Sequence, residues 1–209
     1  MRADQRALLD VMLQAACEAA CDAGRHNLQP RELTLLNEQW TQSYVGIAVN
    51  DELRRRHGAD RSYVTFETSV GWIEEYCGVE GRLGRPPGVL SERQRFDVIA
   101  WSRGGMPIGL VEIKDQPVIS SYAQTADPKK LCGALRRWKS LRWGVFLLSL
   151  RASKADTAAG IKLELESTAE RVAAVIKRAV KSQYDGYSAR AAPGRDSRTA
   201  WMAVRFRRD

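Results

Sequence analysis

The sequence has few of the residues that bind zinc or form disulfides, with four cysteines and two histidines among 209 residues. Cys17 and Cys21 are one helical turn apart among alanines, and Cys77 and Cys132 stand alone. No Cys-x-x-Cys spacing occurs, and two histidines are too few to complete a zinc site. These shortages argue against a zinc module and a disulfide-rich secreted domain, so we expect reduced, packed cysteines in a cytoplasmic protein.

Long apolar stretches are missing as well. No run of about 18 apolar residues occurs, so the sequence predicts no membrane-spanning helix and no membrane partner. The N-terminal segment carries Asp4 and Asp10 and has no continuous apolar stretch before a small-residue cleavage site, so we expect no signal peptide.

What the chain does have is an excess of positive charge. Lysine and arginine number 33 against 25 aspartates and glutamates, which gives a formal net charge of +8. This balance favours a polyanionic partner, because the phosphates of nucleic acid are the commonest acidic surface that a basic protein meets. With 44% hydrophobic residues the chain can bury one substantial core, so we expect one domain with extensions.

Residues 95–101 and 108–113 have the composition of two paired strands. The first segment alternates polar and apolar residues, and the second is apolar apart from one carboxylate. Between them Gly104 and Gly105 supply the positive φ angles that a tight hairpin turn needs. Charges on a hairpin can serve only solubility, but a strand about to be buried on both faces seldom carries two of them.

A turn at that Gly-Gly pair sets Asp97 directly opposite Glu112, with their Cβ atoms about 5 Å apart on one face. Two carboxylates so close repel each other unless a cation lies between them, and Mg²⁺ or Mn²⁺ with oxygen ligands suits this position. Side chains alternate along a strand, so Lys114 emerges on the same face as Glu112, while Val111 and Ile113 point into the core. The sequence therefore predicts a divalent metal ion with an ammonium group beside it.

Asp97 in the segment RFDVIAW, together with Glu112 and Lys114 in the segment VEIK, resembles the signature of the PD-(D/E)XK nuclease superfamily. That superfamily has the restriction-endonuclease-like fold. The resemblance covers roughly residues 31–150 and includes the order of the elements, in which a helix and three strands are followed by a helix and a strand.

The resemblance implies an α/β fold with a restriction-endonuclease-like αβββαβ core, whose mixed central sheet is flanked by helices. Residues 127–139 have the spacing of the second helix of that core, and residues 143–150 have the composition of the buried strand that follows. An alanine-rich helix is predicted over residues 3–23. We therefore divide the chain into an N-terminal helical extension, residues 1–30, and a nuclease-like domain, residues 31–209.

The resemblance also implies a mechanism, the metal-assisted hydrolysis of phosphodiester bonds. Asp97, Glu112 and the main-chain carbonyl of Ile113 would bind Mg²⁺ or Mn²⁺, which polarises the scissile phosphate and lowers the pKa of a bound water. Lys114 would orient that water and stabilise charge on the phosphate, or act as a general base if its pKa is depressed. Gln116 would share the face of Glu112 if the strand continues, although a role as a polar strand-end residue is favoured.

The same family often adds a glutamate from the helix before the first strand. That helix is predicted over residues 32–56 and contains Glu38 and Glu52, while Glu67 lies in the strand predicted over residues 63–70. Glu52 is nearer the helix end that joins the strand, so we assign it to the catalytic set. The other two glutamates remain alternatives.

Basic residues flank the predicted core in two places. Residues 78–94, rich in glycine, proline and arginine, are predicted to form a loop that carries Arg82 and Arg85. The final predicted strand carries Arg205 and Arg207. These arginines would contact a nucleic-acid backbone, or they would belong to a solvated loop and to an edge strand that deters aggregation. Both interpretations stay open.

Two classes of function also stay open. The first is an active metal-dependent nuclease, with DNA as the expected substrate, in a bacterial or phage defence, repair or restriction setting. The second is a catalytically silent module of the same fold that binds nucleic acid or serves assembly. The presence of Asp97, Glu112 and Lys114 together favours the first class. Association as a homodimer or within a larger defence complex is open in either case.

Overall fold

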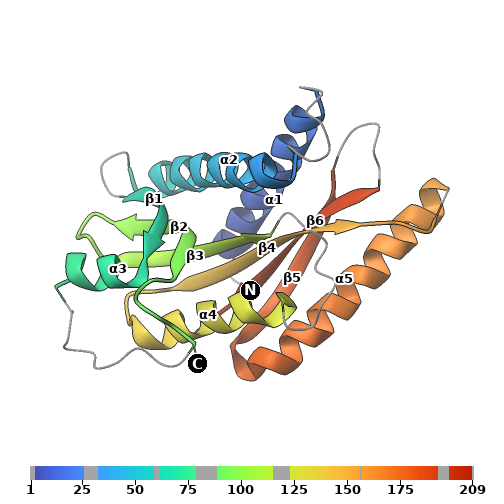
Figure 1. The fold of residues 1–209 in the computed structure, drawn as a ribbon. Coiled ribbons are helices and arrows are strands. Elements are labelled where there is room, and N and C mark those ends of the chain that lie inside the picture. Colours follow the sequence, from blue (N-terminus) through green and yellow to red (C-terminus); the bar gives the residue numbers. More distant parts are fainter. Residues whose placement is uncertain are drawn as a thin grey trace.

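The computed structural model describes residues 3–25, 33–58, 62–78, 89–114, 123–155, 157–192 and 198–208. These segments form one six-stranded sheet with helices on both of its faces (Figure 1). In chain order the elements are α1 (Ala3–Arg25), α2 (Leu33–His57), β1 (Ser62–Ser69), α3 (Val70–Tyr76), β2 (Arg95–Ser102), β3 (Pro107–Lys114), α4 (Ala123–Arg137), β4 (Trp143–Arg151), α5 (Ala158–Val180), a short 3-10 helix (Lys181–Gln183), β5 (Tyr184–Ala191) and β6 (Thr199–Phe206).

The sheet is mixed, with strand order β1-β2-β3-β4-β6-β5. Strands β1, β2 and β3 are antiparallel neighbours, β3 and β4 are parallel, and β6 is antiparallel to both β4 and β5. The predicted α/β class and the mixed sheet flanked by helices are confirmed. Elements α2, β1, β2, β3, α4 and β4 also follow one another in the predicted order, with α3 inserted after β1.

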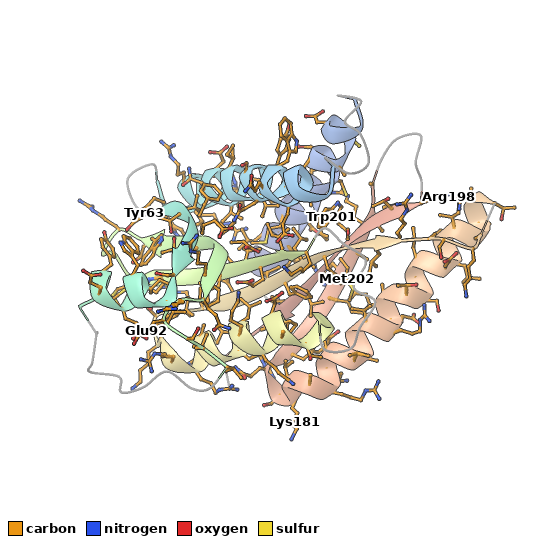
Figure 2. The ribbon with its side chains drawn as sticks, in the orientation of Figure 1. Tyr63, Glu92, Lys181, Arg198, Trp201 and Met202 are labelled. Atoms are coloured by element: carbon orange, nitrogen blue, oxygen red, sulfur yellow. The ribbon has the colours of Figure 1, made fainter. Side chains whose placement is uncertain are left out.

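Two apolar layers cover the sheet. Helices α1 and α2 pack on one face, and α3, α4 and α5 pack on the other. Neighbouring residues of β6 belong to different layers, since Trp201 packs with α1 and α2 while Met202 packs with α4 and α5 (Figure 2). Strand β4 is buried throughout residues 143–150, which explains a sequence that is apolar except for Ser149.

Two elements were not predicted from the sequence. Helix α3 has only seven residues, and it begins after Ser69, whose hydroxyl accepts a hydrogen bond from the Trp72 N–H. Strand β5 forms the far edge of the sheet, and most of its residues are exposed or half-buried. It therefore lacks the apolar alternation by which a strand is recognised in a sequence.

The two groups of basic residues have different outcomes. Arg82 and Arg85 lie outside the described residues. The final strand is present as β6, but it lies between β4 and β5 rather than at an edge, and Arg207 follows it. Arg205 is only 3% exposed, and its guanidinium contacts the Asp185 carboxylate at 2.5 Å. For Arg205 both the nucleic-acid contact and the role on an edge strand were wrong, because the side chain is buried and forms an ion pair with Asp185.

The cysteines are in structural positions. None of the four, all of which lie in described segments, forms a disulfide. The Cys17 Sγ atom lies 3.7 Å from the Ala191 carbonyl oxygen, and burial raises the pKa of this thiol to about 11. Separately, none of the described helices has an apolar stretch long enough to cross a membrane.

Candidate functional site

Strands β2 and β3 form the predicted hairpin, but its turn differs from the predicted Gly-Gly turn, because Gly105 has a positive φ angle of 69° whereas Gly104 does not, and Trp101 pairs with Pro107. Val98 pairs with Val111, and the irregularity in the ladder lies closer to the turn. Asp97 and Glu112 are the next residues outward on the two strands. The same register, continued by one position, sets these two carboxylates opposite each other. The predicted pairing of the two carboxylates thus results from the turn together with the irregularity between Ala100 and Trp101.

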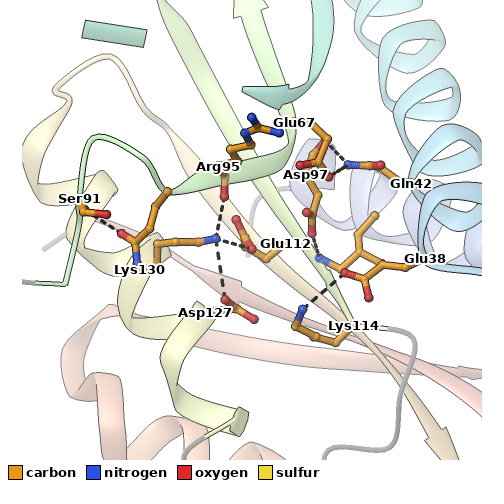
Figure 3. Close-up of polar contacts among 12 residues, drawn as sticks. Glu38, Gln42, Glu67, Ser91, Arg95, Asp97, Glu112, Lys114, Asp127 and Lys130 are labelled. Atoms are coloured by element: carbon orange, nitrogen blue, oxygen red, sulfur yellow. Dashed lines mark hydrogen bonds and ion pairs between the residues drawn. The ribbon is translucent and has the colours of Figure 1, made fainter. Parts of the chain in front are cut away.

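Asp97 is fixed by a main-chain group of the neighbouring strand. Its Oδ2 atom accepts a hydrogen bond from the Ile113 N–H at 2.5 Å (Figure 3). Burial raises the pKa of Asp97 to about 7, against the lowering effects of the Ile113 N–H and the Lys130 charge, while Glu38 and Glu67 raise it further. A carboxyl that titrates near neutral pH is typical of a functional site.

Glu112 is more deeply buried, with 3% of its surface exposed. Its Oε2 atom lies 2.7 Å from the Nζ atom of Lys130, whereas Oε1 is buried and has no hydrogen-bond partner among the described groups. Burial, and next the charge of Asp97, raise the pKa of Glu112 well above its usual value. A buried carboxylate oxygen without a partner is costly, so this atom is available to a ligand.

Lys114 stands at the outer side of the pair. Its Nζ atom lies 3.4 Å from the Glu38 Oε1 atom, and its side chain is 41% exposed. Burial lowers the pKa of Lys114, but the carboxylates of Glu38, Asp127 and Asp97 outweigh that effect and raise it above the usual value. The group is thus a charged ammonium at neutral pH. The general-base role, which needs a depressed pKa, is not supported.

The helix glutamate beside the site is Glu38 and not Glu52. The Glu52 carboxylate is held by Arg55 at 2.8 Å and by Arg56 at 2.6 Å. The hydrogen bond from Arg55, followed by those of Arg56, lowers the pKa of Glu52 to about 2 against the effect of burial. Fourteen residues of α-helix separate it from Glu38, a rise of about 21 Å. Glu52 is an ion-paired residue of the helix end, and this geometry does not support its assignment to the catalytic set.

The direction of α2 explains why Glu38 and not Glu52 lies beside the pair. The Gln42 Nε2 atom donates hydrogen bonds to the Asp97 carbonyl at 2.8 Å and to the Glu67 carboxylate at 2.9 Å. One turn further along α2, the ring of Phe66 packs where a side chain on Gly46 would otherwise sit. The chain leaves the C-terminal end of α2, enters β1, and reaches the site only at the far end of that strand. The N-terminal half of α2 therefore lies over the site.

Glu67 lies near the pair but in an unusual conformation. It faces the position of Asp97 in the neighbouring strand, where the β1–β2 ladder skips one pair. Its φ angle is 49°, a value that costs on the order of 1 kcal/mol or more for a residue with a side chain. Its carboxylate is exposed and held by Gln42. The structure thus places Glu67 beside Asp97, and Glu67 remains an alternative for the additional glutamate of the site.

Three polar residues of this cluster were not recognised in the sequence: Gln42, Asp127 and Lys130. Lys130 is 8% exposed, and its Nζ atom is also 3.8 Å from the Asp127 Oδ1 atom. A signal for it exists, because Lys130 precedes the buried residues Ala134 and Trp138 at helical spacing. A lysine on the apolar stripe of a helix needs a buried partner.

The donor set fits a small divalent cation. Asp97 on β2 and Glu112 on β3 supply carboxylate oxygens, and Ile113, the residue after Glu112 in β3, supplies a main-chain carbonyl oxygen. Within the described ranges, no three His, Cys, Asp or Glu side chains converge into a ready-made cage. Mg²⁺ does not require one, because it keeps several waters and is held by one or two carboxylates. The unpartnered Oε1 atom of Glu112 is the observation that favours such an ion.

Gln116, the further strand-end residue considered for the site, lies outside the described residues.

Comparisons of the chain with models of protein families, with curated proteins and with solved structures give no match. The geometry of the site and the sequence motif are therefore the basis for a function.

The pKa of Asp97 predicts how metal affinity depends on pH. Below about pH 7 an incoming cation must displace the proton of Asp97, so affinity should fall by roughly tenfold per pH unit for each proton displaced. Calorimetry with Mn²⁺ at pH 6, 7 and 8, in buffers with different ionisation enthalpies, would measure both the affinity and the protons released. An affinity that is constant over this range would show that neither buried carboxyl is a ligand.

Proposed function

We propose that the protein is a divalent-metal-dependent nuclease that hydrolyses phosphodiester bonds in nucleic acid, with DNA as the expected substrate. The buried Glu112 Oε1 atom, without a partner and next to Asp97, is the observation that carries the proposal. It is supported by the ammonium group of Lys114, which extends from the same strand two residues further on. The net charge of +8 suits a polyanionic substrate.

The arrangement of the strands gives further support. The order α2, β1, β2, β3, α4 and β4, with β3 parallel to β4, is the order expected for a restriction-endonuclease-like core. The residues that match the PD-(D/E)XK signature lie on β2 and β3, in the middle of this unit. We therefore assign the chain to that fold as part of the proposal, with α1, α3, α5, β5 and β6 as additions.

Asp97, Glu112 and the Ile113 carbonyl would hold the metal ion, Mg²⁺ or Mn²⁺. When bound, such an ion polarises the scissile phosphate and lowers the pKa of a coordinated water. Lys114 donates a charged hydrogen bond to the phosphate oxygen on which negative charge develops. Glu38, at 3.4 Å, orients that ammonium. Each of these groups comes from a strand or helix of the packed core, which favours a fixed geometry.

Replacing each helix glutamate in turn separates the catalytic role proposed for Glu38 from the structural role of Glu52. We expect Glu38→Gln to lower cleavage by about 10- to 100-fold, the range for a residue that orients a functional group, with little change in melting temperature. Glu52→Gln should leave cleavage unchanged and cost about 1 kcal/mol of stability, because Arg55 and Arg56 lose their partner. Single-turnover cleavage and thermal melts of both variants would test this. The reverse pattern would restore Glu52 as the catalytic residue.

The nuclease proposal itself is tested with a panel of substrates. Purified protein is incubated with supercoiled plasmid, linear duplex, single-stranded DNA and RNA in Mg²⁺, Mn²⁺ or EDTA. We expect cleavage with either metal and none in EDTA, and no cleavage by the matched variant Glu112→Gln. Binding without cleavage of any substrate in both metals would contradict the proposal and favour the silent binding module.

A further inference from the structure

Lys130 is a buried lysine that the proposed mechanism does not use. It lies on α4, and its Nζ atom is 2.7 Å from the Glu112 Oε2 atom and 2.8 Å from the Arg95 carbonyl oxygen (Figure 3). The same ammonium lies 3.8 Å from the Asp127 Oδ1 atom and 5.1 Å from the centre of the Phe96 ring. A main-chain carbonyl, two carboxylates and an aromatic face thus hold this side chain in one place.

The contact with Lys130 makes the two carboxylate oxygens of Glu112 unequal. Oε2 is occupied by the Lys130 ammonium, and Oε1 is the buried atom without a hydrogen-bond partner among the described residues. A carboxylate oxygen has two lone-pair sites, and a metal ion that bound both oxygens of Glu112 would share Oε2 with the Lys130 ammonium. Like charges so close together repel strongly in a buried site. This repulsion favours binding of a metal ion through Oε1 alone over binding through both oxygens of Glu112.

Cations differ in what they require of a carboxylate. Mg²⁺ is octahedral with oxygen ligands at about 2.0–2.1 Å and accepts single oxygens, whereas Ca²⁺ takes about 6–8 oxygens at about 2.3–2.6 Å and often uses a carboxylate through both. We propose that Lys130 restricts Glu112 to one-oxygen binding and so sets the preference of this site for Mg²⁺ and Mn²⁺ over Ca²⁺. Lys130 is then a positioning residue, and its role rests on the proposed metal site.

The first test compares two ions on two proteins. Calorimetry with Mn²⁺ alone and with Ca²⁺ alone is carried out on the full wild-type chain and on Lys130→Met, which keeps the length and apolar contacts of the side chain. Loss of the charge alone would tighten both ions alike. If Glu112 can bind through both oxygens in Lys130→Met, the affinity for Ca²⁺ should rise more than the affinity for Mn²⁺. The ratio of the Kd for Ca²⁺ to the Kd for Mn²⁺ should then fall by roughly tenfold. Lys130→Arg keeps a charged donor and should keep the wild-type ratio.

A second measurement needs no variant, in case Lys130→Met does not fold. Infrared difference spectra of the wild-type chain with ¹³C-labelled glutamate carboxylates, recorded with and without Mn²⁺ or Ca²⁺, separate Glu112 from Asp97 through the isotope shift. We expect the band splitting of a carboxylate bound through one oxygen with both ions. A two-oxygen splitting with Ca²⁺ would overturn the inference.

The outcomes separate the two proposals. If the wild-type chain binds neither Mn²⁺ nor Ca²⁺, the metal site fails and the role of Lys130 fails with it. If it binds both ions and Lys130→Met folds with an unchanged ratio of Kd values, the inference about Lys130 is wrong while the proposed metal site stands.

Discussion

Asp97→Asn is expected to abolish metal binding and at the same time to raise the melting temperature of the metal-free protein at pH 8. The carboxyl of Asp97 is ionised at that pH, although burial has raised its pKa to about 7, and it lies beside Glu112. Asparagine is neutral, and its carbonyl oxygen can still accept the hydrogen bond that Ile113 donates. The substitution therefore removes a buried charge without removing the contact.

The size of the effect follows from the pKa. A displacement from 3.8 to about 7 corresponds to at most about 4 kcal/mol of native-state penalty at high pH. We expect the substitution to stabilise the folded protein by on the order of 2 kcal/mol, which raises Tm by about 4–8 °C. This value is below the upper bound because Asp97 and Glu112 can relax together in the wild type and so reduce the penalty. Mutations in a well-packed site usually destabilise. A stabilising substitution that destroys metal binding would thus be a specific sign of two carboxylates held together for a ligand.

The gain should also depend on pH with a definite sign. In the unfolded chain Asp97 ionises near 3.8, and in the folded chain near 7, so the native state loses stability as the pH rises between these values. The advantage of Asp97→Asn should be small near pH 4 and full above pH 7. Thermal melts in EDTA across this range, with Mn²⁺ calorimetry at pH 8, would measure both effects. A variant that is less stable than wild type at pH 8 would contradict the account.

Lys114→Met should lower the rate of cleavage by about 10²-fold or more while metal binding is retained. The expected factor is that for loss of a charged donor to the transition state. Lys114 contacts Glu38 and no atom of the metal-binding pair, so its removal leaves Asp97 and Glu112 in place. Its raised pKa keeps it charged through the physiological range, which makes the ammonium the functional form.

Single-turnover cleavage in Mg²⁺ and calorimetry with Mn²⁺ would separate these two properties of Lys114→Met. Lys162→Met serves as the matched control, because it removes one lysine charge from the exposed face of α5. The control should cleave as the wild type does. Turnover by Lys114→Met within about twofold of the control would show that Lys114 is a surface charge of the strand end.

The hairpin that carries the site could be predicted from the sequence because its determinants are local. The apolar patterns of the two strands and the glycines between them identify the hairpin, and its register decides which carboxylates are opposite each other. The observed pairing of Val98 with Val111 is the predicted one, but it depends on the irregularity between Ala100 and Trp101, which was not predicted. The surrounding helices and strands were predicted from equally local signals, since each has either an apolar periodicity or an apolar run within its own segment.

The helix residues of the site could not be predicted in the same way. Which part of α2 lies over Asp97 depends on the path of the chain through β1 and on the close contact of Phe66 with Gly46. Position in the sequence favoured Glu52, and packing selected Glu38. Burial of Arg205 was missed for a related reason, because the sequence does not show that another strand pairs outside β6.

The most direct test of the central claim, that Asp97 and Glu112 bind one divalent ion, is anomalous diffraction from crystals of the full chain grown in Mn²⁺ at pH 8. We expect a single strong anomalous peak within about 2.0–2.3 Å of an Asp97 carboxylate oxygen, the Glu112 Oε1 atom and the Ile113 carbonyl oxygen. The Lys130 ammonium should remain on Glu112 Oε2. Well-ordered crystals with no peak at this pair, or with a peak only at other carboxylates, would contradict the account.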